Sequence, residues 1–494
     1  MDKSLAISSN KTVVLVRGED DITWSPLVPE IVLYFNKLQL KFSILDVSEF
    51  SIPKFVKPAP WAIEKYDLRS GNRETEKLMG DLKVDYLSIH DEPANEIIPE
   101  NDLSKMEGSV SSLLMTLFSD PTPTRHRILQ PIFKKKALAA AKSLYLRSYG
   151  KFSRLTNLVV VLPNGRFPYQ KAIELAAKRA NAEVLYYERG FRPEAGFFLD
   201  SHTTQDRRAW QEKAKKIQDK SVKSEAINDA VAWLEQRRIP SSKTNEFASF
   251  WSKGKSPSAS KKSFPRNSVA FFTSSKDEYL ALEGWEGFGW EDQYEAFLEF
   301  SANVVGPKVL RVHPNFVNKS FQSALSELRR ILWFLRRAKE TRIVWPTDQV
   351  NSYEIIDNSE RIFVHGSTVG LESSSIGKSV WNSGNSVYDT HADVRRFEPL
   401  QEYERDYFTP WKVEQKRSLE IVQAMINSDF PFSESGRIPQ WNASTIPFFI
   451  RVSNLILAGS IPYLLVLVKK SLSIRANRLL ISISRLIMRH RKFT

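Results

Sequence analysis

The chain has 494 residues, 42% of them hydrophobic and 26% charged, a composition typical of globular proteins that excludes a largely disordered chain. It contains no cysteine, which excludes disulfides, thiolate metal sites and a cysteine nucleophile and agrees with a reducing cytoplasm. The formal net charge is +14, and every charged residue after Glu434 is Lys or Arg, so we expect an anionic partner at this end. The first ten residues lack the apolar core of a signal peptide, so we expect no secretion.

The beginning of the chain predicts an α/β domain. The β-branched and apolar runs Thr12–Arg17 and Lys41–Val47 are predicted strands, and Pro29–Leu40 between them is a predicted helix. The acidic group Glu19–Asp21 follows the first strand, where α/β proteins place functional residues. Asp20 is therefore a candidate catalytic base, and a solvated charged loop is the alternative explanation.

A second pair of strands predicts a crevice in the same domain. The apolar run Leu158–Leu162 is typical of a buried parallel strand, and Ala182–Tyr187 follows it after a predicted helix. The turn Asn164–Arg166 ends the first of these strands and Glu188 ends the second, so both turns should face one crevice. Glu188 is the carboxylate best placed to act as a general base on a hydroxyl. A salt bridge to an arginine of the two turns is the alternative.

The segment Pro240–Lys262 is rich in serine and lysine and is the best candidate for an interdomain linker. A second α/β run follows it, in which short apolar strands each end in a polar turn. The predicted strands are Ser268–Thr273, Lys308–Val312, Arg342–Trp345 and Arg361–Val364. We therefore predict a second sheet with a ligand site at its carboxyl edge.

The turns of this second run carry candidate ligand-binding residues. Ser367 and Thr368 lie in a small-residue turn before a predicted helix, whose free N–H groups and positive dipole end would attract an anion. His313, as a cation or as an Nε2–H donor opposite a phosphate, would stabilise a nucleotide leaving group. Glu372, in the first helical turn, could accept hydrogen bonds from ribose hydroxyls. A plain strand-to-helix connection and a structural histidine beside proline are the alternatives.

Five short motifs occur in an order and spacing that resemble the bacterial capsule-polysaccharide biosynthesis glycosyltransferases, whose relatives include the Kdo transferases of capsule assembly. The motifs are Asn164-Gly165-Arg166, Glu188-x-Gly190, Phe272-x-Ser274-Ser275-x-Asp277-Glu278, Arg311-x-His313-Pro314-Asn315 and Ser367-Thr368-x-Gly370-x-Glu372-x-x-x-x-Gly377-Lys378. The resemblance extends from Leu158 to Tyr388.

The resemblance implies a GT-B-like α/β fold, in which two Rossmann-like domains face each other across a cleft. In this family and the bacterial sialyltransferases, His-Pro and Ser-Ser or Ser-Thr motifs hold the phosphate of a CMP-sugar. By this resemblance His313 would contact the donor phosphate, and Ser367 and Thr368 would bind its oxygens. Glu372 matches a position where related transferases keep a glutamate on the ribose. The motifs make further donor-binding candidates of Asn164, Arg166, Ser274, Ser275, Asp277, Glu278 and Asn315.

The acidic-acidic-Gly base motif of the sialyltransferases has no clean copy in this chain. Glu188 is therefore the first candidate for the base and Asp20 the second. No resident cofactor and no metal are expected. We expect residues 1–240 to form an acceptor-side domain, 241–264 a linker, 265–435 the nucleotide-sugar domain and 440–494 a membrane-associating helical tail.

The expected activity is the transfer of a sugar from a nucleotide donor to a surface polysaccharide or glycolipid at the cytoplasmic face of the membrane. A CMP-linked donor such as that of Kdo or sialic acid is favoured, and a UDP-linked donor comes next. One alternative is a phosphotransferase that uses a CDP-linked polyol to build teichoic-type polymers. The other is a non-catalytic polysaccharide assembly or export protein.

The C-terminal tail predicts a basic amphipathic helix. Residues 471–491 contain neither Pro nor Gly, and at about 100° per residue their charged and apolar residues fall on opposite faces. One face carries Arg475, Arg478, Arg485 and Arg489, and the other Leu472, Leu479, Leu480, Ile483, Leu486 and Ile487. This pattern is typical of an in-plane helix on an anionic membrane, with a helix packed on the protein's own surface as the alternative. Nucleic acid is not expected, because interleaved aromatic residues are missing.

Overall fold

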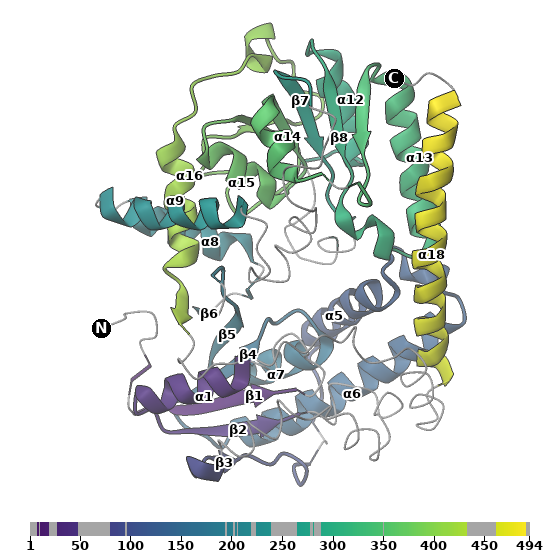
Figure 1. Ribbon diagram of the computed structural model, residues 1–494. Helices are drawn as coiled ribbons and strands as arrows, with labels where there is room; N and C mark the ends of the chain where they lie inside the picture. Colours follow the sequence, from purple (N-terminus) through teal and green to yellow (C-terminus); the bar gives the residue numbers. More distant parts are fainter. Residues whose placement is uncertain are drawn as a thin grey trace. The chain divides into compact units, whose positions relative to one another are not determined.

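The computed structural model describes residues 7–8, 10–18, 27–47, 80–93, 96–192, 195–200, 203–204, 206–218, 224–238, 264–276, 280, 288–348, 350–431 and 461–490. The chain divides into two compact units, whose elements Figure 1 labels. Unit 1 is Met1–Leu117, Thr122–Gln205 and Ser428–Val468, and unit 2 is Phe118–Pro121, Asp206–Asn427 and Lys469–Thr494. Both units contain a largely parallel sheet, so the predicted α/β fold with two Rossmann-like domains is confirmed.

The sheet of unit 1 has the strand order β13-β6-β5-β4-β1-β2-β3. Its parallel strands are β1 (Thr12–Arg17), β2 (Phe42–Asp46), β3 (Asp85–Tyr86), β4 (Leu158–Pro163) and β5 (Glu183–Arg189). Two antiparallel strands, β6 (Ala195–Asp200) and β13 (Asp429–Pro431), complete one edge. Every residue of β4 is buried, as expected for an apolar strand in the middle of a parallel sheet.

Helices cover both faces of this sheet, because successive side chains of a strand point to opposite faces. Val13 and Leu15 of β1 pack in one core with α1 (Leu27–Lys37). Val14 and Val16 pack in a second core with the other helices of the unit. These helices are α5 (Glu100–Phe118), α6 (Leu129–Phe152) and α7 (Pro168–Arg179).

The sheet of unit 2 has the strand order β12-β11-β10-β7-β8-β9, and all of its pairs are parallel. The strands are β7 (Ser268–Phe272), β8 (Lys308–Arg311), β9 (Thr341–Val344), β10 (Ser359–Val364), β11 (Ser379–Asn382) and β12 (Arg395–Arg396). The chain builds outward from β7 through β8 to β9 and then returns to place β10 on the other side of β7. This reversal of strand order is the point where open α/β sheets bind ligands.

Two layers of helices enclose the unit 2 sheet. On one side α12 (Gln293–Ala302) and α13 (Phe321–Arg337) surround an aromatic core that contains Phe271 and Phe363. On the other side α14 (Ser352–Asn358) and α15 (Thr368–Ser375) pack on Phe272 and Val364. The remaining helices of the unit are α8 (Arg207–Gln218), α9 (Ser224–Arg238), α16 (Gln415–Ile426) and, from Lys469 onward, α18 (Ile461–His490), together with the short turns η4 (Pro314–Asn318) and η5 (Arg405–Phe408).

The units differ from the predicted ranges at several boundaries. Residues 428–431 of the predicted C-terminal domain belong to unit 1, and the predicted tail divides between the units at Lys469. The N-terminal domain was expected to end at residue 240, but α8 and α9 belong to unit 2, because Ala230 and Leu234 pack into a core with Leu419 and Val422 of α16. Residues 241–263 of the predicted linker and 440–460 of the predicted tail lie outside the described residues. Among the described helices, none is long and apolar enough to cross a membrane.

Candidate functional site

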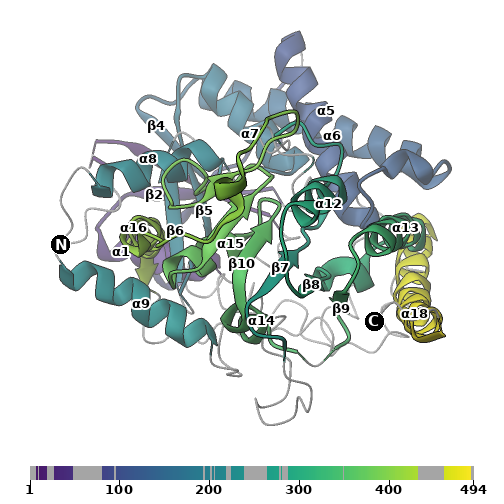
Figure 2. The same ribbon diagram turned by 90° about the horizontal axis from the view of Figure 1, so that it is seen from above.

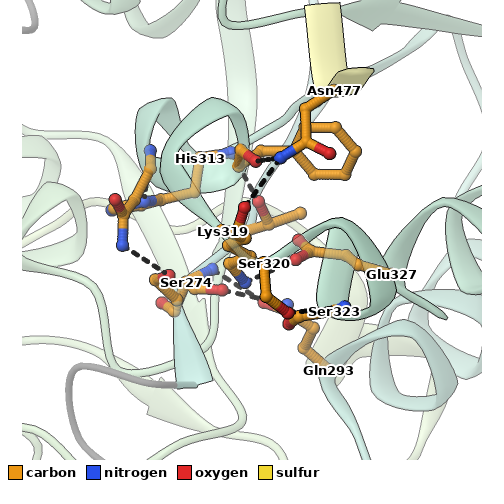
Figure 3. A network of polar contacts seen from close by, with 12 residues as sticks. Ser274, Gln293, His313, Lys319, Ser320, Ser323, Glu327 and Asn477 are labelled. Carbon is orange, nitrogen blue, oxygen red and sulfur yellow. Dashed lines mark hydrogen bonds and ion pairs between the residues drawn. The ribbon is translucent and has the colours of Figure 1, made fainter. Parts of the chain in front are cut away.

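Ser274 joins three elements at the carboxyl edge of the unit 2 sheet (Figure 3). It follows β7, and its buried hydroxyl donates to the carbonyl oxygen of His365, which follows β10, over 2.5 Å. Its backbone N–H donates to Oε1 of Gln293 over 2.7 Å, and Nε2 of Gln293 donates back to the Ser274 carbonyl over 3.1 Å. The hydrogen bonds of Ser274 therefore connect the ends of β7 and β10, where the strand order reverses, to α12.

His313 lies at the end of β8, next to the loop that follows β7. Its N–H donates to the hydroxyl oxygen of Thr273 over 2.7 Å, and its Nδ1 accepts the N–H of Asn315 over 3.2 Å. The side-chain amide of Asn315 in turn donates to Ser275 over 3.3 Å. Since Nδ1 is an acceptor here, the neutral ring carries its proton on Nε2. The ring is half-buried.

Gly366 begins the turn after β10 in a conformation that only glycine adopts easily. Its φ is +71°, and a Cβ at this position would lie 2.6 Å from the carbonyl oxygen of Asn385. Its N–H donates to Oδ1 of Asn382, at the end of β11, over 2.8 Å. The turn therefore packs closely against the end of β11 and the residues that follow it.

Ser367 is the N-cap of α15, and its hydroxyl accepts the N–H of Val369 over 3.4 Å. With this cap the helix begins at Thr368. The Ser367 carbonyl accepts the hydroxyl of the buried Tyr388. Because Ser367 is half-buried and Thr368 exposed, the N-terminal end of α15 is reachable from solvent.

Glu372 is buried, and both of its carboxylate oxygens have protein partners. Oε1 pairs with the Arg237 guanidinium over 3.0 Å, and Oε2 accepts the hydroxyl of Tyr353. Burial and then the Glu372 charge raise the pKa of Tyr353, so this hydroxyl stays protonated. In this structure Glu372 joins α9, α14 and α15, and its expected ribose contact stays a prediction.

The two predicted turns of unit 1 meet side by side. Asn164 has a φ of +48°, and its side-chain amide donates to Oε2 of Glu188 over 2.6 Å. Oε1 of Glu188 accepts the N–H of Arg189 over 3.1 Å. The Arg166 side chain donates to the hydroxyl of Ser112 over 2.6 Å. The structure therefore brings Asn164 and Glu188 together at the ends of β4 and β5.

Three predicted site residues, Asp20, Asp277 and Glu278, lie outside the described residues. The others divide between the two units. The group of unit 1 contains Asn164, Arg166 and Glu188, and that of unit 2 contains Ser274, Ser275, His313, Asn315, Ser367, Thr368 and Glu372. Their roles toward a ligand stay predictions.

Sequence reasoning missed Gln293, Asn382 and Asn477, three amides that hold the turns of the unit 2 group. A signal existed for Asn382, because it is a polar residue at the end of an apolar strand, the criterion that selected Ser274 and His313. Gln293 follows the N-cap Asp292 and resembles any first-turn residue of a helix. Asn477 lies more than 150 residues from its partners Phe316 and Lys319, so no local pattern indicates it.

The environment of His365 predicts a loss of stability in acid. The ring is 5% exposed and its Nδ1 shares a hydrogen bond with Ser383 over 3.0 Å. Burial, with the Lys276 charge second, lowers its pKa from 6.5 to about 4. As the pH falls from 6.5 to 4 the unfolded chain binds this proton first, so the free energy of unfolding should fall by about 3 kcal/mol.

This loss is measured by urea unfolding across that pH range, followed by tryptophan fluorescence. The matched variant His365→Asn keeps a polar partner for Ser383 but does not titrate. Over the same pH range its free energy of unfolding should fall by about 3 kcal/mol less than that of the native chain. An identical pH dependence in both proteins would show that His365 does not cause it.

Fold and site together define a two-unit α/β protein with a polar group of residues at the strand-order reversal of one sheet. No protein-family model matches the chain, and no curated protein matches it. Among solved structures, a β-Kdo 2,7-transferase, KpsC of Thermosulfurimonas dismutans, is 13% identical with a TM-score of 0.34, covering 56% of this chain and 80% of that chain. A β-Kdo 2,4-transferase of the same protein and organism is 16% identical with a TM-score of 0.32, covering 54% and 78%. The UDP-GlcNAc 2-epimerase of Methanocaldococcus jannaschii is 11% identical with a TM-score of 0.29, covering 86% and 96%.

Proposed function

We propose that this protein is a glycosyltransferase that moves a sugar from a nucleotide donor to a surface polysaccharide or glycolipid. The observation that carries the proposal is the position of His313 and of the N-terminal end of α15. They follow β8 and β10, the two strands that flank β7, at the carboxyl edge of one parallel sheet. His313 is half-buried and Thr368 exposed, and both lie where an α/β sheet changes its strand order. Donors in this position suit the phosphate of a nucleotide sugar.

His313 and the N-terminal turn of α15 bind different oxygens of the donor phosphate in this proposal. Nε2–H of His313 donates to a phosphate oxygen, and the N-terminal N–H groups of α15 and the Thr368 hydroxyl bind the others. When the sugar leaves, negative charge develops on the phosphate oxygen that had been bonded to the anomeric carbon. Donors already held in place by Thr273, Asn315 and the α15 cap stabilise this charge without rearrangement.

The base in this proposal is Glu188 of unit 1. The acceptor hydroxyl oxygen bonds to the anomeric carbon, the bond from that carbon to the phosphate oxygen breaks, and the hydroxyl proton passes to the Glu188 carboxylate. Asn164 supports this role, because its amide holds one carboxylate oxygen in a fixed position. A CMP-linked donor is proposed first and a UDP-linked donor second, and the reaction is proposed to need no metal.

The proposal is tested by thermal shift of the full chain with CMP, CDP, UDP, GDP and their sugars. A nucleotide at 100 times its dissociation constant should stabilise the protein by about 2.7 kcal/mol. The variant His313→Ala should lose this gain, because the phosphate loses its donor, while its melting without nucleotide is compared with that of the native chain. His90→Ala is the matched control, since His90 is an exposed histidine in unit 1.

Each nucleotide leads to a different conclusion. Stabilisation by CMP that depends on His313 supports a CMP-sugar transferase, and selective stabilisation by UDP or GDP keeps the activity and changes the donor. A response confined to CDP-linked polyols would favour the phosphotransferase alternative. No response to any nucleotide, with the native fold intact, would reject the donor site and favour a non-catalytic glycan-binding protein.

A further inference from the structure

Helix α18 packs on unit 2 through the buried Ile481 and through several polar residues. Asn477 is fully buried, and its side-chain amide donates to the carbonyl oxygens of Val317 and Lys319 over 3.2 and 2.8 Å (Figure 3). Ser473 accepts the N–H of Phe321 over 3.2 Å, and Arg485 pairs with Asp348. The helix runs alongside α13 in both views (Figures 1 and 2). This set of contacts fixes which side of α18 faces the protein.

From Lys469 onward, the opposite side of α18 leaves four large apolar side chains in solvent. The exposed fractions are 60% for Leu472, 61% for Leu479, 45% for Ile483 and 58% for Leu486. At about 100° per residue these four fall within an arc of about 60°, roughly opposite the buried Asn477. We call these four residues the leucine stripe. A helix that only completes the fold of a soluble unit normally exposes its polar side. Helix α18 buries Ile481 in the core of unit 2 and also leaves a row of apolar side chains exposed.

Basic residues border the leucine stripe. Arg475 and Arg478 are exposed on α18, and neither forms an ion pair with any of the described residues. On the helical wheel Arg475 lies next to Leu486, and Arg478 lies further around the same side. The sequence has no acidic residue after Glu434, so α18 itself offers these arginines no carboxylate. The stripe therefore needs a partner that is apolar in the middle and anionic at the edge.

We propose that the leucine stripe docks α18 in the plane of an anionic lipid bilayer. The four apolar side chains enter the acyl boundary, and the flexible stems of Arg475 and Arg478 carry their charges to the lipid phosphates. A second copy of the chain fits less well, because paired stripes would bring four arginines together with no acidic residue on either helix to balance them. This inference concerns α18 alone and does not depend on the proposed catalysis.

The test is sedimentation of the full chain with two kinds of vesicle, one of phosphatidylcholine alone and one of equimolar phosphatidylcholine and phosphatidylglycerol. The native chain should bind the anionic vesicles at least ten times more tightly, and added salt should weaken the binding. The double variant Leu479→Gln/Leu486→Gln should lose at least tenfold in binding. Its melting temperature should not change, because both side chains are exposed and glutamine is a good helix former.

Matched controls separate the stripe from general surface effects. Leu400→Gln removes another exposed leucine of unit 2 and should bind as the native chain does. Arg475→Gln/Arg478→Gln should weaken binding more than Arg266→Gln/Arg405→Gln, which removes the same charge from two other exposed sites of the unit.

Two results would overturn the proposal. The first is unchanged vesicle binding by the leucine variant or absence of binding by the native chain. The second is a dimer of the native chain in sedimentation velocity that the leucine variant abolishes, because the stripe would then be covered by a second copy.

Discussion

Replacing Glu372 with alanine is expected to lower the free energy of unfolding of unit 2 by about 3–5 kcal/mol, because the change leaves a charged partner without its counter-ion in a buried place. Glu372 is 7% exposed and pairs with Arg237 over 3.0 Å. The Tyr353 hydroxyl loses its acceptor in the same variant. Urea unfolding is followed by tryptophan fluorescence, since Trp345 and Trp381 lie in the core of this unit.

A neighbouring ion pair provides the matched control. Arg238, next to Arg237 on α9, pairs with Asp357 of α14, and the two side chains are 32% and 46% exposed. Because exposed pairs contribute about 1 kcal/mol or less, Asp357→Ala should change stability little. The variant Glu372→Gln separates structure from ligand binding. Normal stability combined with lost stabilisation by nucleotide would contradict the structural role and favour the ribose contact predicted from the sequence.

Replacing Lys319 with alanine is the second change with a large expected effect. Lys319 and Glu327 form a buried ion pair, with side chains 4% and 9% exposed, and Glu327 also accepts the Tyr294 hydroxyl over 3.2 Å. Removal of the lysine leaves the Glu327 carboxylate buried without its cation, at an expected cost of about 3–5 kcal/mol. Lys319 is the C-cap of η4 and His313 is its N-cap, so the same urea experiment also tests what stabilises this turn.

Two further variants sharpen this second prediction. The double change Lys319→Met/Glu327→Leu removes both charges and should regain most of the lost stability, because no buried charge is then unpaired. Glu414→Ala breaks the exposed pair with Arg417 and should have almost no effect. If Lys319→Ala is as stable as Glu414→Ala, the buried pair does not contribute as the structure indicates.

The parallel strands could be predicted from the sequence because their residue types strongly favour buried strands. Leu158–Pro163 and Ser268–Phe272 are apolar and rich in β-branched or aromatic residues, and both are fully buried strands as expected. The polar residues after them also follow from position, since parallel strands bring their carboxyl ends to one edge. That argument placed Asn164 near Glu188 and Ser274 at the same edge as the turn after Val364, and the hydrogen bonds agree.

The antiparallel edge of unit 1 could not be predicted, because it depends on pairing across the chain. The strand Asp429–Pro431 has only three residues and no apolar period of its own. It becomes a strand because it pairs with Ala195–Phe197 and because Asp429 accepts the N–H groups of Phe191 and Arg192 over 2.9 Å each. Partners more than 200 residues apart give no local signal.

The sequence by itself predicted that the C-terminal residues 471–491 form a helix, since this run contains neither Pro nor Gly and its apolar and basic residues separate at the helical period. It also determined that an apolar and a basic face exist. Only the tertiary structure decided which face meets the protein, because the carbonyl groups of the η4 turn needed donors and Asn477 supplied them. In the same way, the position of Glu372 follows from the sequence, but its partner Arg237 comes from a helix 135 residues away. Which hydrogen-bond and ion-pair partners meet depends on the tertiary fold, so no local sequence pattern indicates them.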